Sequence, residues 1–200
     1  MKVLVTGFSP FGGGQINASW EAVRRLPRRI EAMEIVTAEL PTSFARALPA
    51  LEAAIARASP ELVLCVGQAG DRGALCVERV AVNLQDARIP DNDGAQPVDA
   101  PIVAGGPAAY LATLPVRAAV AALRAADLPA QLSMSAGTFV CNHAFYGLMR
   151  LAAAARPAFR GGFLHVPCLP GQAEPGAPSM PLEDIVRGIG VVLEAAAREK

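Results

Sequence analysis

The sequence predicts one α/β domain with a largely parallel sheet and helices on both of its faces. The chain has 200 residues, enough for a single sizeable core. Hydrophobic residues make up 52% and charged residues 18%, which excludes a disordered chain. Short apolar segments of strand type alternate with segments of helical type along the chain. This alternation is typical of parallel sheets with crossover helices, so residues 1–200 are expected to form a single domain.

The first third of the chain is expected to contain three strands and two helices. The strands are short, apolar runs rich in β-branched residues and bounded by Gly or Pro. The first helix has a capping residue, Asn17 or Ser19, and the second is Ala-rich with apolar spacings of three and four. The expected strands are Lys2–Phe8, Glu34–Leu40 and Leu62–Val66, and the expected helices are Ser19–Leu26 and Ser43–Arg57.

The middle of the chain has a different character. Cys76–Leu84 partly alternates apolar and polar residues, which predicts a more exposed strand or hairpin. Asp86–Pro107 is dense in Pro, Gly, Asp and Asn, and loops of this length are often functional. Regular alternation then returns, with helices expected at Pro115–Asp127, Asn142–Ala155 and Pro181–Arg198 and strands at Gln131–Met134 and Gly162–Val166.

Charge, hydropathy and cysteine usage exclude several classes of protein. The formal net charge is zero, whereas a nucleic-acid binder usually carries a basic excess. No apolar run is long enough to span a bilayer, and the first residues fit a strand better than a signal peptide. The four cysteines lack C-x-x-C spacing, so free thiols in a reducing cytoplasm are expected. Neither nucleic acid nor membrane is therefore an expected partner.

Candidate catalytic residues follow from the rule that sites in such sheets lie at the carboxyl ends of strands. Cys141 lies where a strand is followed by a helix. A helix N-terminus lowers the pKa of a thiol, and the Cys141 N–H could face a developing oxyanion. Cys65 is expected to be an inert core thiol, and nothing comparable favours Cys76 or Cys168.

A thiol nucleophile needs a base, and the chain has two histidines. His143 lies two residues after Cys141 on the same helix, so their side chains point in different directions. His165 lies near the carboxyl end of another strand, where its side chain can meet Cys141. The acid that would orient the imidazole stays open among Glu78, Asp86, Asp91 and Asp93.

A zinc site is the rival interpretation of the same residues. Cys141, His143, His165 and Cys168 read as C-x-H…H-x-x-C. Structural zinc sites favour C-x-x-C knuckles, and a one-residue spacing at a helix start is awkward for tetrahedral ligation. We therefore expect no metal.

Two loops after strands suggest ligand contacts. The glycine-rich turn after the first strand lacks the Lys-Ser/Thr of a phosphate loop, and it carries Phe8 and Phe11. These rings fit an apolar pocket, although core packing is an equal alternative. Gln68, in the turn after the third strand, could bind an amide-like ligand or simply face solvent.

The chain closely resembles the pyroglutamyl peptidase I family of cytosolic cysteine peptidases, also called pyrrolidone-carboxylate peptidases. Eight segments in one order carry the resemblance across nearly the whole chain. They are Thr6–Gly13, Leu40–Thr42, Gly67–Gly70, Glu78–Asn83, Asp86–Asn92, Gly105–Tyr110, Ala136–His143 and His165–Pro167.

The resemblance implies a three-layer α/β/α sandwich of the phosphorylase/hydrolase-like kind, with a twisted, largely parallel but mixed sheet. It implies removal of N-terminal pyroglutamyl residues from peptides through a thioacyl-enzyme, without metal or cofactor, by a homodimer or homotetramer in the cytoplasm. The Pro- and Gly-rich segment Pro167–Pro181 is a candidate contact loop between copies.

The resemblance also implies roles for particular residues. The family's triad falls on Cys141, His165 and Glu78, and its oxyanion hole on Arg88 with the Cys141 N–H. Its substrate pocket falls on four residues, Phe8, Phe11, Gln68 and Phe139.

The chain departs from the family's pattern at Asp71, where a glycine is usual, and at Met134, where a polar residue is expected. These departures bear on the pocket rim. Two alternatives stay open: a cysteine amidase acting on another cyclic amide, and a non-catalytic small-molecule-binding protein on the same scaffold.

Overall fold

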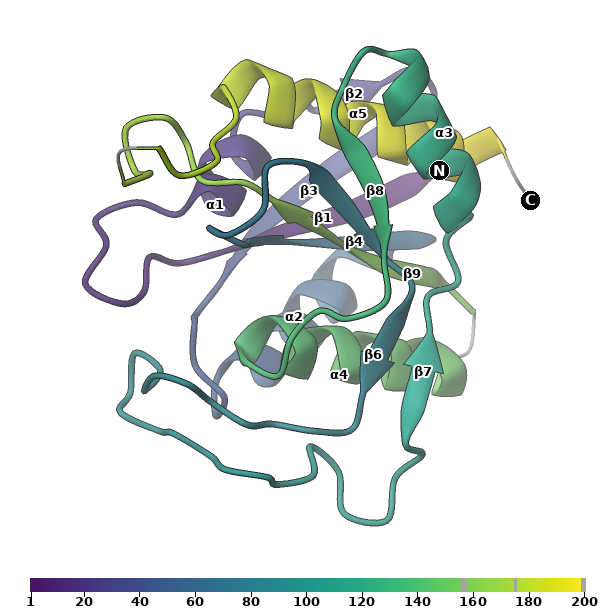
Figure 1. The fold of residues 1–200 in the computed structure, drawn as a ribbon. Helices are drawn as coiled ribbons and strands as arrows, with labels where there is room; N and C mark the ends of the chain where they lie inside the picture. Colours follow the sequence, from purple (N-terminus) through teal and green to yellow (C-terminus); the bar gives the residue numbers. More distant parts are fainter. Residues whose placement is uncertain (156–157, 175, 199–200) are drawn as a thin grey trace.

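A computed structural model describes residues 1–155, 158–174 and 176–198. Within these residues, seven strands form one sheet in the order β2-β3-β1-β4-β9-β5-β8, and β6 and β7 form a small second sheet (Figure 1). The strands are β1 (Lys2–Phe8), β2 (Arg29–Ile30), β3 (Met33–Leu40), β4 (Leu62–Gln68), β5 (Leu75–Glu78), β6 (Val80–Val82), β7 (Ala109–Leu111), β8 (Ala130–Ser133) and β9 (Arg160–Val166). The helices are α1 (Ala18–Val23), α2 (Ala47–Ala58), α3 (Val116–Ala125), α4 (Val140–Ala154) and α5 (Leu182–Arg198).

The main sheet is mixed but largely parallel, which confirms the predicted α/β fold. Strands β3, β1, β4 and β9 run parallel to one another. Strand β2 is antiparallel to β3, and β5 is antiparallel to β9. Because β5 also pairs with β8 in parallel, β5 and β8 run opposite to the four central strands β3, β1, β4 and β9.

Helices cover both faces of this sheet, with α1, α3 and α5 on one face and α2 and α4 on the other (Figure 1). Strand β1 contributes side chains to the hydrophobic core on both faces of the sheet, because successive side chains of a strand point to opposite faces. Val3 and Val5 pack in the cluster that includes α1, α3 and α5. Leu4 and Phe8 pack in the cluster that includes α2 and α4. This burial on both sides explains why β1 has no polar face.

The middle of the chain corrects one expectation. Cys76–Leu84 was expected to form a more exposed strand or hairpin, but its first residues belong to β5, which is fully buried between β9 and β8. The partial alternation arises because the chain leaves the main sheet at Arg79 and β6 then pairs with β7. Strands β2 and β7, of two and three residues, have no strong sequence pattern and were not predicted.

Helix boundaries shift by a few residues from the expected ones. Asn17 caps α1, because its Oδ1 accepts a hydrogen bond from the Ser19 N–H at 3.0 Å. Helix α4 begins at Val140, so Cys141 and Asn142 both lie in its first turn. None of the helices in the described part of the chain is long and apolar enough to cross a bilayer.

Candidate active site

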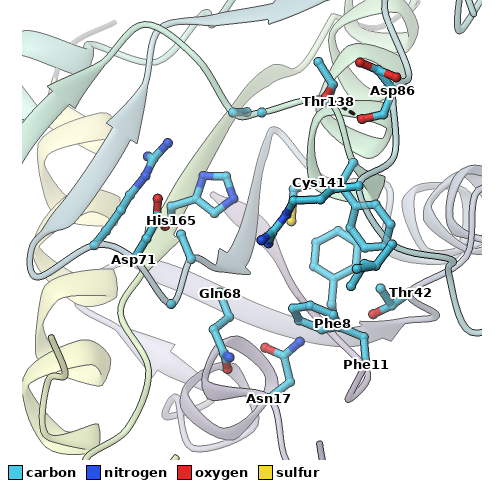
Figure 2. Close-up of a pocket in the computed structure, with 18 residues that line it drawn as sticks. Phe8, Phe11, Asn17, Thr42, Gln68, Asp71, Asp86, Thr138, Cys141 and His165 are labelled. Carbon is cyan, nitrogen blue, oxygen red and sulfur yellow. Dashed lines mark hydrogen bonds between the residues drawn. The ribbon is translucent and has the colours of Figure 1, made fainter. Parts of the chain in front are cut away.

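A cavity of about 430 Å³ opens at the carboxyl ends of β1, β4 and β9. Figure 2 shows Phe8 and Phe11 on one side of Cys141 and His165 on the other, with Asp71 beyond His165. The cavity therefore has an aromatic side and a side with titratable groups, and Cys141 lies between them. A small, mostly apolar pocket with a few polar groups is the usual form of a binding site.

Helix α4 and strand β4 together place the sulfur of Cys141. Gly137, with a φ of 74°, lets the chain turn between β8 and α4. A Cβ atom added to Gly67 would lie only 2.8 Å from Cys141 Sγ, so the sulfur packs directly over this glycine. Gly67 pairs with His165 in the register of β4 and β9. The thiol and the imidazole thus leave neighbouring positions at the same edge of the sheet.

Asn142 anchors the first turn of α4. This buried side chain donates hydrogen bonds to the carbonyls of Val82 and Leu84 at 2.9 Å, and its Oδ1 accepts one from the Val82 N–H at 3.0 Å. Cys141 is therefore held beside the segment that leads from β6 into the long loop.

The environment of the Cys141 thiol contradicts the expected effect of the helix N-terminus. Burial, and next the carboxylate of Glu78, raise the pKa of this thiol to about 12, while Arg72 opposes the rise. The expectation of a lowered thiol pKa is therefore wrong for the free protein. At neutral pH the group is a thiol, and it can act as a nucleophile only if a base removes its proton.

Alkylation kinetics test this protonation state. Because the thiolate is the reactive form, we expect iodoacetamide to label Cys141 slowly at pH 6–7 and progressively faster as the pH approaches about 12. Labelling would be followed by mass spectrometry of the peptide that contains Cys141, with Cys141→Ala as the blank. Rapid labelling at mildly acidic pH would contradict the raised pKa.

His165 and Glu78 form a buried pair behind the sulfur. His165 Nδ1 lies 2.8 Å from Glu78 Oε1, and Glu78 is completely buried. A carboxylate acceptor favours the tautomer with the proton on Nδ1, which leaves Nε2 as a free acceptor. His165 lines the cavity, so this imidazole is suited to take a proton from a group bound there.

The three other acids considered from the sequence have different places. Asp86 is exposed at the cavity rim. The carboxylate of Asp91 accepts hydrogen bonds from three backbone N–H groups, those of Phe44, Asp93 and Ala95. Asp93 pairs with Arg46. Glu78 is the one of the four acids that hydrogen-bonds His165.

The remaining histidine and cysteines lie outside this arrangement. His143 is buried edge-on against Phe44, and burial lowers its pKa to about 4. Cys65 is a core thiol whose pKa burial raises to about 12, and Cys76 is buried in β5. Cys168 accepts a hydrogen bond from Gln68 Nε2 at 3.3 Å. The described residues contain no group of three or more His, Cys, Asp or Glu side chains able to hold a metal, so the zinc interpretation has no geometric support.

The three phenylalanines expected in the pocket, Phe8, Phe11 and Phe139, all line the cavity. Phe8 is buried, the ring of Phe11 lies tilted against that of Phe139 with 6.1 Å between their centroids, and Phe139 in turn meets Phe44 edge-on at 5.4 Å. Phe8 therefore both packs in the core and lines the pocket, so the two interpretations of this ring hold together. Thr42 and Ile89 also line the cavity; both lie in segments that carry the family resemblance, but neither was assigned a role there.

Gln68 lines the cavity, but most of its amide is already used. Its Oε1 accepts hydrogen bonds from the Ala18 N–H at 2.7 Å and from Gln172 at 3.2 Å, and one Nε2–H points to Cys168. One N–H of Gln68 is left for a ligand.

Arg88 lies in the long loop and lines the cavity with an exposed side chain. The loop is fixed near Arg88 by Asp91, whose carboxylate accepts a hydrogen bond from the backbone N–H of Phe44, in the turn before α2.

Arg72 is a residue that the sequence did not single out. It lines the cavity and forms an ion pair with Glu78 at 2.7 Å. Of the two departures, Asp71 lies exposed at the rim, whereas Met134 is 62% exposed and does not line the cavity.

Comparison with known proteins gives concordant results. A family model described as "Pyroglutamyl peptidase" matches residues 1–199. The pyrrolidone-carboxylate peptidase of Streptomyces coelicolor is 52% identical over 199 residues, covering 98% of this chain and 92% of that protein. Pyrrolidone-carboxylate peptidase 1 of Ralstonia nicotianae is 51% identical over 201 residues, covering 99% and 94%. The crystal structure of pyroglutamyl peptidase I from Bacillus amyloliquefaciens superposes with a TM-score of 0.96 at 46% identity, covering 99% of this chain and 97% of that one.

Proposed function

The chain belongs to the pyroglutamyl peptidase family, and from this premise we propose that it removes N-terminal pyroglutamyl residues from peptides as a cysteine-type peptidase. The catalytic residues are assigned from one observation: a thiol and an imidazole at the cavity lie together with a buried carboxylate. Cys141 borders the cavity beside His165, and His165 is hydrogen-bonded to Glu78 at 2.8 Å. We assign these residues as nucleophile, base and orienting acid.

In the proposed reaction, His165 Nε2 takes the thiol proton as Cys141 Sγ attacks the carbonyl carbon of the scissile amide. The carbonyl π electrons move to oxygen, and this oxyanion is stabilised by Arg88 and the Cys141 N–H. As the C–N bond breaks, His165 returns the proton to the leaving amine, and a thioacyl-enzyme is left. Water, deprotonated by His165, then attacks the thioester, releases pyroglutamate and regenerates the thiol.

The pocket suits an uncharged lactam. The rings of Phe8, Phe11 and Phe139 offer apolar contact to its faces, and the free N–H of Gln68 can donate to its carbonyl. A glutamyl residue differs by a charged amine and a charged carboxylate, and burying these groups among phenyl rings without partners is unfavourable. Selectivity for the lactam over its open form is therefore an expected property of the pocket.

Release of an arylamine tests the proposed function. The protein is expected to hydrolyse a pyroglutamyl-arylamide and to leave the prolyl and glutamyl analogues nearly untouched. The prolyl compound lacks only the lactam carbonyl and carries a basic amine, so it is the sharper control. Equal turnover of all three substrates, or of none, would refute the proposal.

Glu78→Gln tests the orienting role. The amide keeps the size of the carboxylate but can turn its NH₂ group toward His165 Nδ1 and favour the wrong tautomer, so kcat is expected to fall by roughly 10³–10⁴-fold. The loss should be smaller than that caused by removing the nucleophile, because Glu78 does not react. Steady-state kinetics on the pyroglutamyl-arylamide measure kcat for both variants. A loss in Glu78→Gln equal to that in Cys141→Ala would contradict the orienting role of Glu78.

We further propose a cytoplasmic location and a homodimeric or homotetrameric assembly. All four cysteines are free, which fits a reducing compartment. The candidate contact segment Pro167–Pro181 includes Pro175, which lies outside the described residues. Light scattering of the purified protein tests the assembly.

A further inference from the structure

Arg72 makes contacts that the proposed mechanism has not used. It lies in the turn between β4 and β5 and is partly buried. Its Nη1 donates to Glu78 Oε1 at 2.7 Å and to Ser133 Oγ at 3.3 Å, and its Nη2 donates to the Ser135 carbonyl at 2.9 Å. The guanidinium group of Arg72 thus links the Glu78 carboxylate to the end of β8 and the residues that follow it.

The same carboxylate oxygen serves two partners. Glu78 Oε1 lies 2.8 Å from His165 Nδ1 and 2.7 Å from Arg72 Nη1. The other oxygen, Oε2, is buried and has no hydrogen-bond partner in the described part of the chain. All polar contacts of this carboxylate in the described residues therefore converge on Oε1.

A buried carboxylate is unfavourable unless a positive charge is paired with it. Glu78 is completely buried, so its ionised form depends on its partners. His165 is a cation only when it holds a second proton, whereas an arginine is always charged. Between turnovers, when His165 must be neutral to act as a base, Arg72 is the permanent charge in contact with Glu78.

We propose that Arg72 is a positioning residue that holds Glu78 ionised and, by sharing its charge, keeps His165 unprotonated and ready to act as a base. This inference rests on the proposed roles of Cys141, His165 and Glu78. The Arg72–Glu78 pair is neutral as a unit, so it orients the imidazole without strongly favouring the imidazolium. Without Arg72, the uncompensated carboxylate would draw a proton onto His165.

Other titratable or charged groups around the pair come from four elements. Asp71 is exposed in the same turn as Arg72, Cys76 of β5 lies near the guanidinium, and Cys141 of α4 lines the same cavity as His165. Asp86 and Arg88, from the long loop, line the same cavity. None of these is a cation in hydrogen-bond contact with Glu78, so none replaces Arg72 when its charge is removed.

Arg72→Gln is expected to move the acid limb of the kcat/KM profile upward by about one pH unit. At its new optimum, kcat should fall by roughly 10- to 100-fold because Glu78 and His165 lose part of their support, while KM changes little. Arg72→Lys keeps the charge and should restore most of the profile. Arg187→Gln breaks an ion pair with Asp184 on α5, away from the cavity, and is the matched control with a wild-type profile.

The second measurement does not depend on catalysis. The chain has two histidines, so NMR can follow the His165 ring directly, and His143 is an internal reference because burial lowers its pKa to about 4. In Arg72→Gln, the ring of His165 is expected to stay protonated to a pH about one unit higher than in the wild type. The same titration is measured in Arg72→Met, so that the test does not depend on a single variant being folded. Circular dichroism checks that both variants are folded.

The outcomes separate this inference from the proposed function. An unchanged or lowered His165 titration in a folded neutral variant would overturn the role of Arg72, even if the wild type cleaves pyroglutamyl substrates. A raised titration in a protein that cleaves none of them would support the charge sharing and refute the proposed function. A fall in kcat without movement of the acid limb would reduce Arg72 to a structural support and overturn the inference.

Discussion

Cys141→Ala is expected to lower kcat/KM for a pyroglutamyl-arylamide by about 10⁴-fold or more, since removing a nucleophile abolishes the covalent route. The residual rate would come from the oxyanion donors and from substrate binding. The substitution removes one sulfur atom from the wall of an open cavity, and the smaller side chain creates no clash. Thermal unfolding followed by circular dichroism should therefore remain close to the wild type.

Cys168→Ala is the matched control. Cys168 is a second thiol near the cavity, where it accepts a hydrogen bond from Gln68, but it does not line the cavity wall. This variant should keep most of the activity. If Cys141→Ala retained turnover comparable to that of Cys168→Ala, the nucleophile would have been assigned to the wrong residue.

The parts of the fold that could be predicted are those whose signal is local. Strand β1 was predicted with its observed bounds, because a strand buried on both faces is a continuous apolar run between turn residues. Strand β2 has two residues, too few to produce any period. Strand β5 was expected to be exposed, because its burial depends on β8 and β9, which come much later in the chain.

The candidate site divides in the same way. Cys141 and His165 could be selected because each follows from the rule that sites lie at strand ends. The choice of Glu78 among four acids depends on the antiparallel register of β5 and β9, which no local pattern records. The pairing of Arg72 and the raised pKa of the Cys141 thiol depend on depth and neighbours in the folded protein.

Gly67→Ala is expected to reduce both activity and stability. A Cβ atom at this position would lie 2.8 Å from Cys141 Sγ and 2.8 Å from Cζ of Phe163, closer than atoms normally pack. Phe163 is fully buried between the rings of Phe8, Phe145 and His165, so it has little room to yield. The sulfur must move instead, and a displacement of about 1 Å at a reacting atom can lower kcat roughly 100-fold.

The stability effect can be separated from the catalytic one by denaturant unfolding. Overpacking of this kind should lower the free energy of unfolding by about 1–3 kcal/mol. Gly190→Ala is the matched control, because a Cβ atom there would meet nothing within 4 Å on α5. Its free energy of unfolding should stay unchanged or rise by up to about 1 kcal/mol.

The double variant Gly67→Ala/Cys141→Ala measures how much of the destabilisation comes from contact between the added methyl group and Cys141 Sγ. If the added methyl group acts partly by pressing on Sγ, removing that atom should recover part of the lost free energy of unfolding. The pressure from Phe163 would remain, so recovery should be incomplete. Strict additivity of the two substitutions, together with wild-type kcat in Gly67→Ala, would mean that Cys141 Sγ is not packed over β4. The proposed attack geometry beside His165 would then lose its basis.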